Sequence, residues 1–267
     1  MSGNLKIGII GGTGQLGSAI ATGWLEAGCV APDDLWISNR SGTASGFDAW
    51  PEVNFTASNQ ELADVCDVIL LSVPPALIGT IGIVAPDKLV ISVMAGVSRE
   101  QIMQLTGSSR AVRAMSSPAA RYRQAYSPWF DERTLNKADR DTVCALLSAI
   151  GASDELPDES QIEVFTVVTG PVPGFAAFFA DCMVQFAVAN NVDPDVAVRA
   201  AKQLMTSSAS LMSSQNLPPS AYVKEMIDYG GTTTAGLVKL QELGVAGLFG
   251  EGLKASLERV RAIAPDD

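Results

Sequence analysis

Three glycines near the start of the chain have the spacing of a dinucleotide-binding turn. A short apolar segment at residues 6–10 leads into Gly12, Gly14 and Gly17, and a helix-like run follows at residues 18–25. In a Gly-x-Gly-x-x-Gly turn the first glycine allows the tight change of direction, the second lets the backbone approach a pyrophosphate, and the third lets the helix pack against the strand. Unpaired N–H groups at the helix start then bind the phosphates. We therefore expect a bound dinucleotide here, with an ordinary strand-to-helix turn as the alternative.

The residues after the second predicted strand decide which dinucleotide is expected. That strand, at residues 35–37, ends in Ser38, Asn39 and Arg40, where NAD enzymes place an acidic residue that accepts the ribose hydroxyls. No acid occupies this position. Because arginine forms bidentate, charge-assisted hydrogen bonds with phosphate oxygens, the sequence favours NADP(H) over NAD(H). The alternative is a solvated surface arginine.

The elements around these residues follow the order of a doubly wound α/β domain. Segments at residues 65–73, 89–93 and 110–115 are almost continuously apolar, as strands of a covered parallel sheet are. Ligands bind at the carboxyl ends of such strands, so the residues that follow them are expected beside the cofactor. The expected cofactor set is Gly12, Thr13, Gly14, Gln15, Leu16, Gly17, Ser38, Asn39, Arg40, Val73, Pro74, Ala95 and Gly96.

The second half of the chain shows helical patterns without strands. We expect a Rossmann-type domain with a doubly wound parallel sheet at residues 1–158, followed by an all-helical domain at residues 159–267. The expected helices are 175–191, 195–212, 220–227, 232–243 and 249–263. The first of them is apolar around most of its circumference, which a lone helical domain cannot bury. The pattern therefore predicts a homodimer or a dimer-based homo-oligomer.

Composition excludes several classes of function. The 267 residues carry a net charge of −11, which argues against nucleic acid or an anionic membrane as the main partner. There is no histidine, and the four cysteines have no paired spacing, so we expect no metal site and interpret the cysteines as buried free thiols. The early first strand leaves no room for a signal peptide, and the longest apolar run, residues 174–192, contains polar side chains. We expect a cytoplasmic protein with a small-molecule substrate.

Four segments together resemble the pyrroline-5-carboxylate reductase family, nearly end to end. They are KIGIIGGTGQLGSAI at residues 6–20, SNRS at 38–41, LVISVMAGVS at 89–98, and GGTTTAGL at 230–237 with LQELG after it. The last segment is the most specific, because a Gly-Gly-Thr-Thr loop that opens a helix rarely arises by chance. Enzymes of this family have an N-terminal Rossmann domain and a C-terminal helical dimerisation domain, and they reduce a cyclic imine carboxylate with NAD(P)H in the last step of proline synthesis.

The resemblance also indicates which residues would act on the substrate. Thr233 is the expected hydrogen-bond donor toward the ring nitrogen, and backbone N–H groups at the start of the same helix offer a carboxylate site. The other expected substrate-binding residues are Gly230, Gly231, Thr232, Tyr229 and Thr169. The alternative is that the two threonines, Thr232 and Thr233, only cap a helix that begins near Thr234.

The chain departs from the family in the loops that would contact the substrate. Ser116-Ser117-Pro118 stands where the family has Met-Pro-Asn-Thr-Pro after the sixth strand, with one residue missing. Residues 169–174 replace a Ser-Gly-Ser-Gly-Pro-Ala segment, and a lone Tyr229 replaces Ser-Pro. The cofactor and dimer scaffolds thus look retained, whereas the true substrate stays open.

The expected activity is NADPH-dependent reduction of 1-pyrroline-5-carboxylate or a related cyclic imine. A protonated imine already carries its positive charge, so the protein must position it and exclude water rather than supply a strong acid. Two alternatives stay open. The first domain also resembles deazaflavin-dependent NADP reductases, and the altered loops would also suit an idle dimer that binds NADP as a sensor or scaffold.

Overall fold

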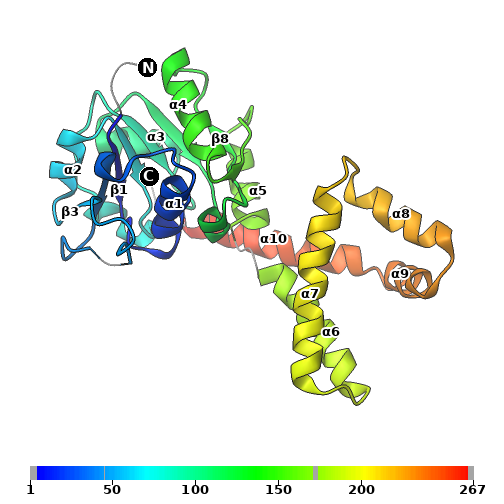
Figure 1. Ribbon diagram of the computed structural model, residues 1–267. Helices are drawn as coiled ribbons and strands as arrows, with labels where there is room; N and C mark the ends of the chain where they lie inside the picture. The colour runs from blue at the N-terminus through cyan, green and yellow to red at the C-terminus, as the bar shows by residue number, and fades with distance from the viewer. Residues whose placement is uncertain (1–4, 45, 171–173, 264–267) are drawn as a thin grey trace. The chain divides into compact units, whose positions relative to one another are not determined.

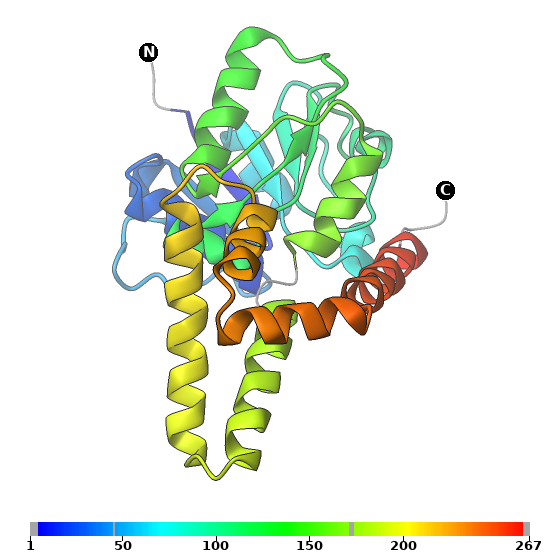
Figure 2. The ribbon, with the colours of Figure 1, turned by 90° about the vertical axis from the view of Figure 1, so that its right-hand side faces the viewer.

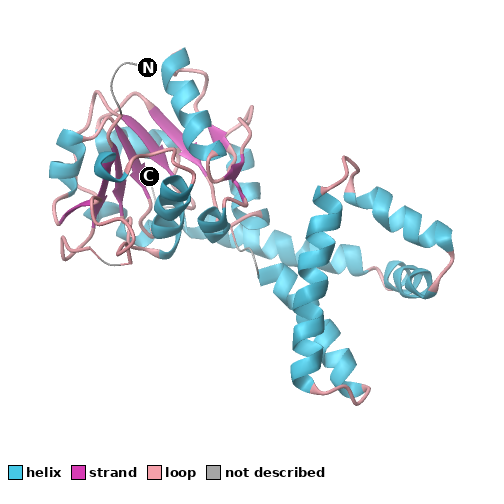
Figure 3. Cartoon of the chain, viewed as in Figure 1, coloured by secondary structure: helices cyan, strands magenta, loops and turns pink. Residues whose placement is uncertain are grey.

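The chain divides into two compact units in the computed structural model, which describes residues 5–44, 46–170 and 174–263. One unit comprises residues 1–171 with 256–267, and the other comprises residues 172–255. Every strand of the described residues lies in the first unit, whereas the second is built of helices (Figure 3). The predicted class, a parallel α/β domain followed by an all-helical one, is confirmed. The domain boundary that the sequence places after residue 158 stays a prediction.

The sheet of the first unit has seven strands in the order β3-β2-β1-β4-β5-β6-β8. They are β1 (Ile7–Ile10), β2 (Leu35–Ser38), β3 (Asn54–Thr56), β4 (Val68–Leu71), β5 (Leu89–Ser92), β6 (Ala111–Ala114) and β8 (Trp129–Phe130). The first six are parallel, and β8 pairs with β6 in the antiparallel direction. Two further short strands, β7 (Ala125–Tyr126) and β9 (Gly151–Ala152), form a separate parallel pair. The sequence analysis missed β3, β7, β8 and β9, because two or three residues are too few to show a periodic pattern.

Helices cover both faces of this sheet (Figure 1). They are α1 (Gln15–Glu26), α2 (Asn59–Val65), α3 (Arg99–Thr106), α4 (Lys137–Ser148) and α5 (Ser160–Val168), with short 3₁₀ turns η1 (Pro32–Asp34), η2 (Pro75–Thr80) and η3 (Pro118–Tyr122). Side chains of a strand alternate between faces, so Ile9 packs in the cluster with α1 and α4, and Ile10 packs in the cluster with α2 and α3. The buried indole of Trp24 on α1 donates a hydrogen bond to the carbonyl of Leu146 on α4 at 2.7 Å. These two cores explain why the strands are apolar on both faces.

The second unit contains helices α6 (Gly174–Ala189), α7 (Pro194–Ser213), α8 (Pro219–Tyr229) and α9 (Thr232–Glu242), together with the first part of α10 (Val245–Ile263). Asp193 caps α7: its carboxylate accepts hydrogen bonds from the N–H groups of Asp195 and Val196. Helix α10 begins at Val245 rather than near residue 249, because Gly244, with φ of 68°, completes the turn after α9 by itself.

Helix α6 lies beside α7 in this unit and has no buried residue (Figure 2). Its large apolar side chains face outward, and Phe186 and Phe178 are 73% and 62% exposed. Within residues 174–263, only Ala197 and Ala201 on α7 are buried hydrophobic residues. Helix α6, which the sequence predicts to be too apolar for a lone helical domain, is therefore not covered by the rest of a single chain.

The expectation of buried free thiols is wrong for three of the four cysteines. All four are free, but Cys29, Cys144 and Cys182 are exposed. Cys144 faces outward because the neighbouring residues of α4 at 143, 146 and 147 supply its buried face. Only Cys66 is buried, and burial, with the nearby Asp67 carboxylate, raises the pKa of its thiol to about 12.

The described residues contain neither a membrane-spanning helix nor a metal-binding cluster. None of the described helices is long and apolar enough to cross a membrane. In the same part of the chain, no group of three or more histidine, cysteine or acidic side chains is placed to hold a metal ion.

Candidate functional site

The loops that follow β1, β2, β4 and β5 meet at the carboxyl edge of the sheet. Ile10 is in register with both Ser38 and Leu71, and Leu71 is in register with Ser92. Backbone hydrogen bonds continue this alignment past the strands: the Gly11 N–H donates to the Ser38 carbonyl at 3.3 Å. The structure thus gathers in one place all the segments that the sequence assigns to the cofactor, namely 12–17, 38–40, 73–74 and 95–96.

Gly11 is the left-handed residue of the turn after β1, and the sequence analysis missed it. Its φ is 82°, and a Cβ at this position would lie 2.5 Å from the Ser72 carbonyl oxygen. Gly12, to which the sequence analysis gave the tight turn, has no positive φ; a Cβ there would lie 2.8 Å from a methyl carbon of Ile37. The Gly-Gly doublet was the signal that could have located both roles.

Gly17 allows α1 to begin directly against this turn. A Cβ at Gly17 would lie 2.5 Å from the Gly11 carbonyl oxygen and 2.9 Å from the Gly12 Cα. Because these are backbone atoms, no side-chain rotation could relieve the contact. The predicted role of Gly17, close packing of helix and strand, is the role that the structure gives it.

The start of α1 offers unpaired backbone donors to an anion. Its N-cap is Gly14, so no side chain caps the helix, and the first backbone bond within it runs from Ser18 N to the Gly14 carbonyl. The N–H groups of residues 15–17 therefore have no partner within the helix. Thr13, Gly14 and Gln15 are exposed, so a phosphate can reach them. With unpaired N–H donors and an exposed surface, the turn fits a pyrophosphate.

Asn39 shapes the loop that carries Arg40. Its Oδ1 accepts hydrogen bonds from the N–H groups of Ser41 at 3.1 Å and Gly42 at 2.7 Å, and its Nδ2 donates to the Thr43 carbonyl. Ser38 is buried and donates to Asn59 Oδ1 at 2.7 Å. The side chains of Ser38 and Asn39, both predicted to bind cofactor, are thus already engaged within the protein and position the loop instead.

The Arg40 guanidinium is free for a ligand. The residue is exposed, and among the described residues its side chain has no hydrogen bond or ion pair. A fixed loop with an unpaired guanidinium at the end of the second strand suits a ribose 2′-phosphate. The positive charge of Arg40 and its place after the second strand both fit NADP(H).

The remaining cofactor candidates lie at the ends of β4 and β5. Val73 contacts the glycine turn closely, since a Cβ at Gly11 would lie 2.9 Å from its Cγ1. Pro74, which follows it, is exposed. Gly96 has φ of 73°, a conformation that favours glycine, and reverses the chain after Ala95. These residues can contact a bound nucleotide through backbone and apolar surface.

In the second unit, the segment between α8 and α9 keeps its hydroxyls and its helix start unpaired. Gly230, with φ of 76°, ends α8, and Gly231 is the N-cap of α9. Helix α9 has no side-chain cap, and among the described residues the hydroxyls of Thr232 and Thr233 make no hydrogen bond. The capping alternative for these two threonines is therefore wrong.

Thr234 makes the structural contact that the alternative assigned to its neighbours. Its hydroxyl donates to the Met226 carbonyl on α8 at 2.7 Å and so joins the two helices. Tyr229, at the end of α8, is 84% exposed. Residues 229–233 thus form a largely exposed segment with backbone donors and, among the described residues, the unpaired hydroxyls of Tyr229, Thr232 and Thr233, which suits a small carboxylate.

Two other predicted substrate segments have structural contacts of their own. Thr169 ends α5 in the first unit, and its hydroxyl donates to the Phe165 carbonyl at 2.7 Å. Residues 171–173 of its loop lie outside the described residues, so the role of Thr169 in binding substrate stays a prediction. Ser116 is buried and shares a 2.9 Å hydrogen bond with Ser127, which leaves Ser117 as the hydroxyl of that loop without a hydrogen bond among the described residues.

Comparison with known proteins agrees with the resemblance seen in the motifs. Residues 159–263 match the family model described as pyrroline-5-carboxylate reductase dimerisation, and residues 6–96 match the one described as NADP oxidoreductase, coenzyme F420-dependent. Pyrroline-5-carboxylate reductase 2 of Bacillus subtilis is 28% identical over 244 residues, which cover 89% of this chain and 87% of that protein. Pyrroline-5-carboxylate reductase of Methanosarcina acetivorans is 26% identical over 267 residues, covering 97% and 98%.

The fold is also that of a solved relative. The structure of Plasmodium falciparum pyrroline carboxylate reductase with NADP bound superimposes with a TM-score of 0.82 at 22% identity, over 98% of this chain and 99% of that one. At this identity the likeness concerns the fold alone. The resemblance predicted from the four sequence segments is confirmed.

Proposed function

We propose that this chain, which belongs to the pyrroline-5-carboxylate reductase family, reduces 1-pyrroline-5-carboxylate or a related cyclic imine with NADPH. The observation that carries the proposal is the unpaired hydroxyl of Thr233 beside the uncapped start of α9. That segment offers one hydroxyl donor and several backbone N–H groups to a small ring that bears a nitrogen and a carboxylate. NAD(H) is the less favoured cofactor, because Arg40 rather than an acid follows β2.

The chain's contribution to the reaction is positioning and charge. NADPH, when bound, supplies the hydride for the imine carbon. As that carbon accepts the hydride, the electron pair of the C=N bond moves to nitrogen, which keeps the proton of the iminium form. Thr233 would donate a hydrogen bond toward this nitrogen, and the N–H groups at Gly231 and Thr232 would hold the carboxylate. No histidine is needed, because the ring nitrogen already carries its proton.

The experiment that tests the function is NADPH oxidation against a panel of substrates. 1-Pyrroline-5-carboxylate, other cyclic imines, linear imines and ketones are compared at equal concentration, and a reduced deazaflavin with NADP as acceptor tests the alternative that the match at residues 6–96 favours. Turnover of a cyclic imine carboxylate supports the proposal. Hydride exchange only with the deazaflavin would replace it, and NADPH binding without any turnover would favour a sensor or scaffold.

Arg40→Ala is expected to weaken NADPH binding about tenfold and to leave NADH binding unchanged. The guanidinium is exposed, so the loss of its charge-assisted contact with a 2′-phosphate should cost roughly 1.4 kcal/mol, below the usual range for buried contacts to charged groups. Fluorescence titration with both nucleotides measures this, and NADH serves as the internal control because it lacks the 2′-phosphate. Equal losses for both nucleotides would show that Arg40 only supports the fold of the loop.

We also propose a homodimer in which the second copy covers the apolar face of α6. The described side chains of this helix are left unburied by a single chain, and the match to a dimerisation family spans this helix. Light scattering at micromolar concentration should give twice the chain mass. Phe186→Glu places a charge at the most exposed apolar position of α6 and should shift the mass toward one chain, whereas Glu251→Lys, a charge change on exposed α10, should not. A single-chain mass for the unmodified protein would contradict the proposal.

Two predictions from the sequence concern location and domain boundaries. The cytoplasmic location and the use of residues 1–158 and 159–267 as separate domains remain predictions of the sequence.

A further inference from the structure

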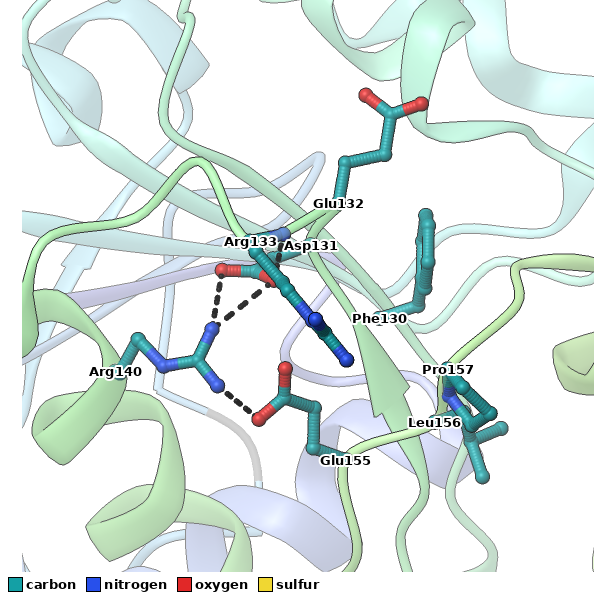
Figure 4. A pocket seen from close by; sticks show the side chains of 8 residues that line it. All are labelled: Phe130, Asp131, Glu132, Arg133, Arg140, Glu155, Leu156 and Pro157. Atoms are coloured by element: carbon teal, nitrogen blue, oxygen red, sulfur yellow. Dashed lines mark hydrogen bonds and ion pairs between the residues drawn. The ribbon is translucent and has the colours of Figure 1, made fainter.

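A pocket of about 620 Å³ lies in the first unit (Figure 4). All of its lining residues come from the segments 130–133, 140 and 155–157. None of them belongs to the cofactor or substrate sets described above. The pocket is therefore an independent feature of the first unit.

Strand direction separates this pocket from the nucleotide turn. Strand β8 pairs antiparallel with β6, with Trp129 opposite Ala114 and Phe130 opposite Arg113. The chain that leaves β8 after Phe130 thus runs toward the amino ends of the parallel strands. The cofactor loops follow the carboxyl ends of these strands, at the opposite edge of the sheet.

The turn that forms one wall of the pocket is strained. Glu132 and Arg133 have φ values of 56° and 60°, two successive non-glycine residues in the left-handed region. Asp131 holds this turn: its buried carboxylate accepts hydrogen bonds from the N–H groups of Arg133 at 2.7 Å and Leu135 at 3.4 Å. Backbone strain that the surrounding structure maintains in this way is concentrated at binding sites.

Most charges of the pocket are paired with one another. Arg140 bridges the Asp131 carboxylate and Glu155 Oε2, and Glu132 points away from the pocket to form an ion pair with Arg99 at 2.8 Å (Figure 4). The two bonds that Arg140 makes to Asp131, at 3.2 and 3.3 Å, fix its guanidinium beside the turn. Arg140, Asp131 and Glu155 thus hold one another in place along one wall of the pocket.

One cation and one carboxylate oxygen that line the pocket have no partner among the described residues. Within the described residues, the Arg133 guanidinium has no hydrogen bond or ion pair, and Glu155 Oε1 has none either. Arg133 is exposed, and its side chain lines the pocket together with those of Arg140 and Glu155 (Figure 4). Phe130, Leu156 and Pro157 form an apolar wall next to them (Figure 4).

We propose that this pocket binds a free α-amino acid with an apolar side chain. Arg133 would hold the carboxylate, Glu155 the ammonium group, and the wall of Phe130, Leu156 and Pro157 the side chain. A simple anion would face the Glu155 and Asp131 carboxylates, and a simple cation would face Arg133, so only a ligand with both charges satisfies the unpaired groups. The proposal does not depend on the reductase function.

The test is calorimetric titration of the full-length protein with L-leucine as the probe. N-acetyl-L-leucine lacks the ammonium charge, and L-leucinamide lacks the carboxylate charge, so each should bind at least tenfold more weakly than L-leucine. Heat of binding requires no turnover, so a failure here and a failure of the proposed reductase activity are distinguishable. Absence of binding by L-leucine, or equal binding by all three compounds, would overturn the proposal.

Variants assign the binding to this pocket. Arg133→Ala should weaken L-leucine binding at least tenfold, and Arg133→Gly should do the same while suiting the left-handed φ of this position. Lys137→Ala removes the same charge from an 88% exposed side chain on neighbouring α4 and should bind as the unmodified protein does. Thr233→Ala should also bind L-leucine normally. Normal binding by both Arg133 variants, or loss of binding in Thr233→Ala, would overturn the assignment.

Discussion

Gly17→Ala is expected to lower the affinity for NADPH on the order of 100-fold. The new Cβ would lie 2.5 Å from the Gly11 carbonyl oxygen and 2.9 Å from the Gly12 Cα, so α1 must move away from the turn. That movement would displace the N–H groups of residues 15–17 from the positions at which we propose that they bind the phosphates. Weakening two hydrogen bonds to a charged group, each of about 1.5–3 kcal/mol, accounts for the loss. Fluorescence titration with NADPH measures it.

Two control variants separate this effect from general sensitivity to alanine. Gly79→Ala, in η2, has no atom within 4 Å of the new Cβ and no positive φ, so its affinity for NADPH should be unchanged. Gly23→Ala, also in α1, would meet the Ala120 carbonyl oxygen at 2.3 Å, and should lower the free energy of unfolding by about 1–3 kcal/mol. Its effect on nucleotide affinity should be smaller than that of Gly17→Ala, because it lies two turns from the helix start. Unchanged NADPH affinity in Gly17→Ala would place the nucleotide elsewhere.

Thr233→Ala is expected to lower the rate of imine reduction about 10- to 100-fold and to leave NADPH binding and thermal stability unchanged. Its hydroxyl has no hydrogen-bond partner among the described residues, so its removal costs the folded protein little. In the reaction it would donate a hydrogen bond to the ring nitrogen, an interaction of about 1–3 kcal/mol. Thr233→Ser should recover part of the rate. Steady-state turnover of the best imine, with NADPH titration and thermal unfolding, measures the three quantities.

The adjacent threonine provides the matched control. Thr234→Val removes a hydroxyl whose hydrogen bond to the Met226 carbonyl joins α8 and α9. It should lower the free energy of unfolding by about 1 kcal/mol and change the rate less than Thr233→Ala does. If Thr234→Val slows reduction as much as Thr233→Ala while both fold, then the precise fold of this segment matters rather than the Thr233 hydroxyl. The catalytic assignment of Thr233 would then be dropped.

The sequence by itself determined the order of elements and the positions of the glycines. Apolar strands such as residues 68–71 and 89–92 are buried on both faces, so their composition alone indicates a covered parallel sheet. The spacing of the glycines is also informative by itself, because the Cβ of any other residue at position 17 would clash with backbone atoms of Gly11 and Gly12. The N-cap of α7 at Asp193 is local in the same way, since a cap depends on residues at most three positions apart.

Only the tertiary structure decided which of the candidate side chains are free. The sequence offers Ser38, Asn39 and Arg40 alike as cofactor-binding residues. In the structure Ser38 is hydrogen-bonded to Asn59 on α2 and Asn39 to its own loop, so Arg40 is the one whose side chain is free among the described residues. The same holds for three successive threonines, of which only Thr234 has a hydrogen bond from its hydroxyl to α8 among the described residues. The partner of Ser38 is 21 residues away along the chain, and the nearer partners of Asn39 and Thr234 are reached only because the folded loop and the turn between α8 and α9 bring them close. The pocket at Arg133 has the same origin, because its lining comes from segments that are joined only by folding.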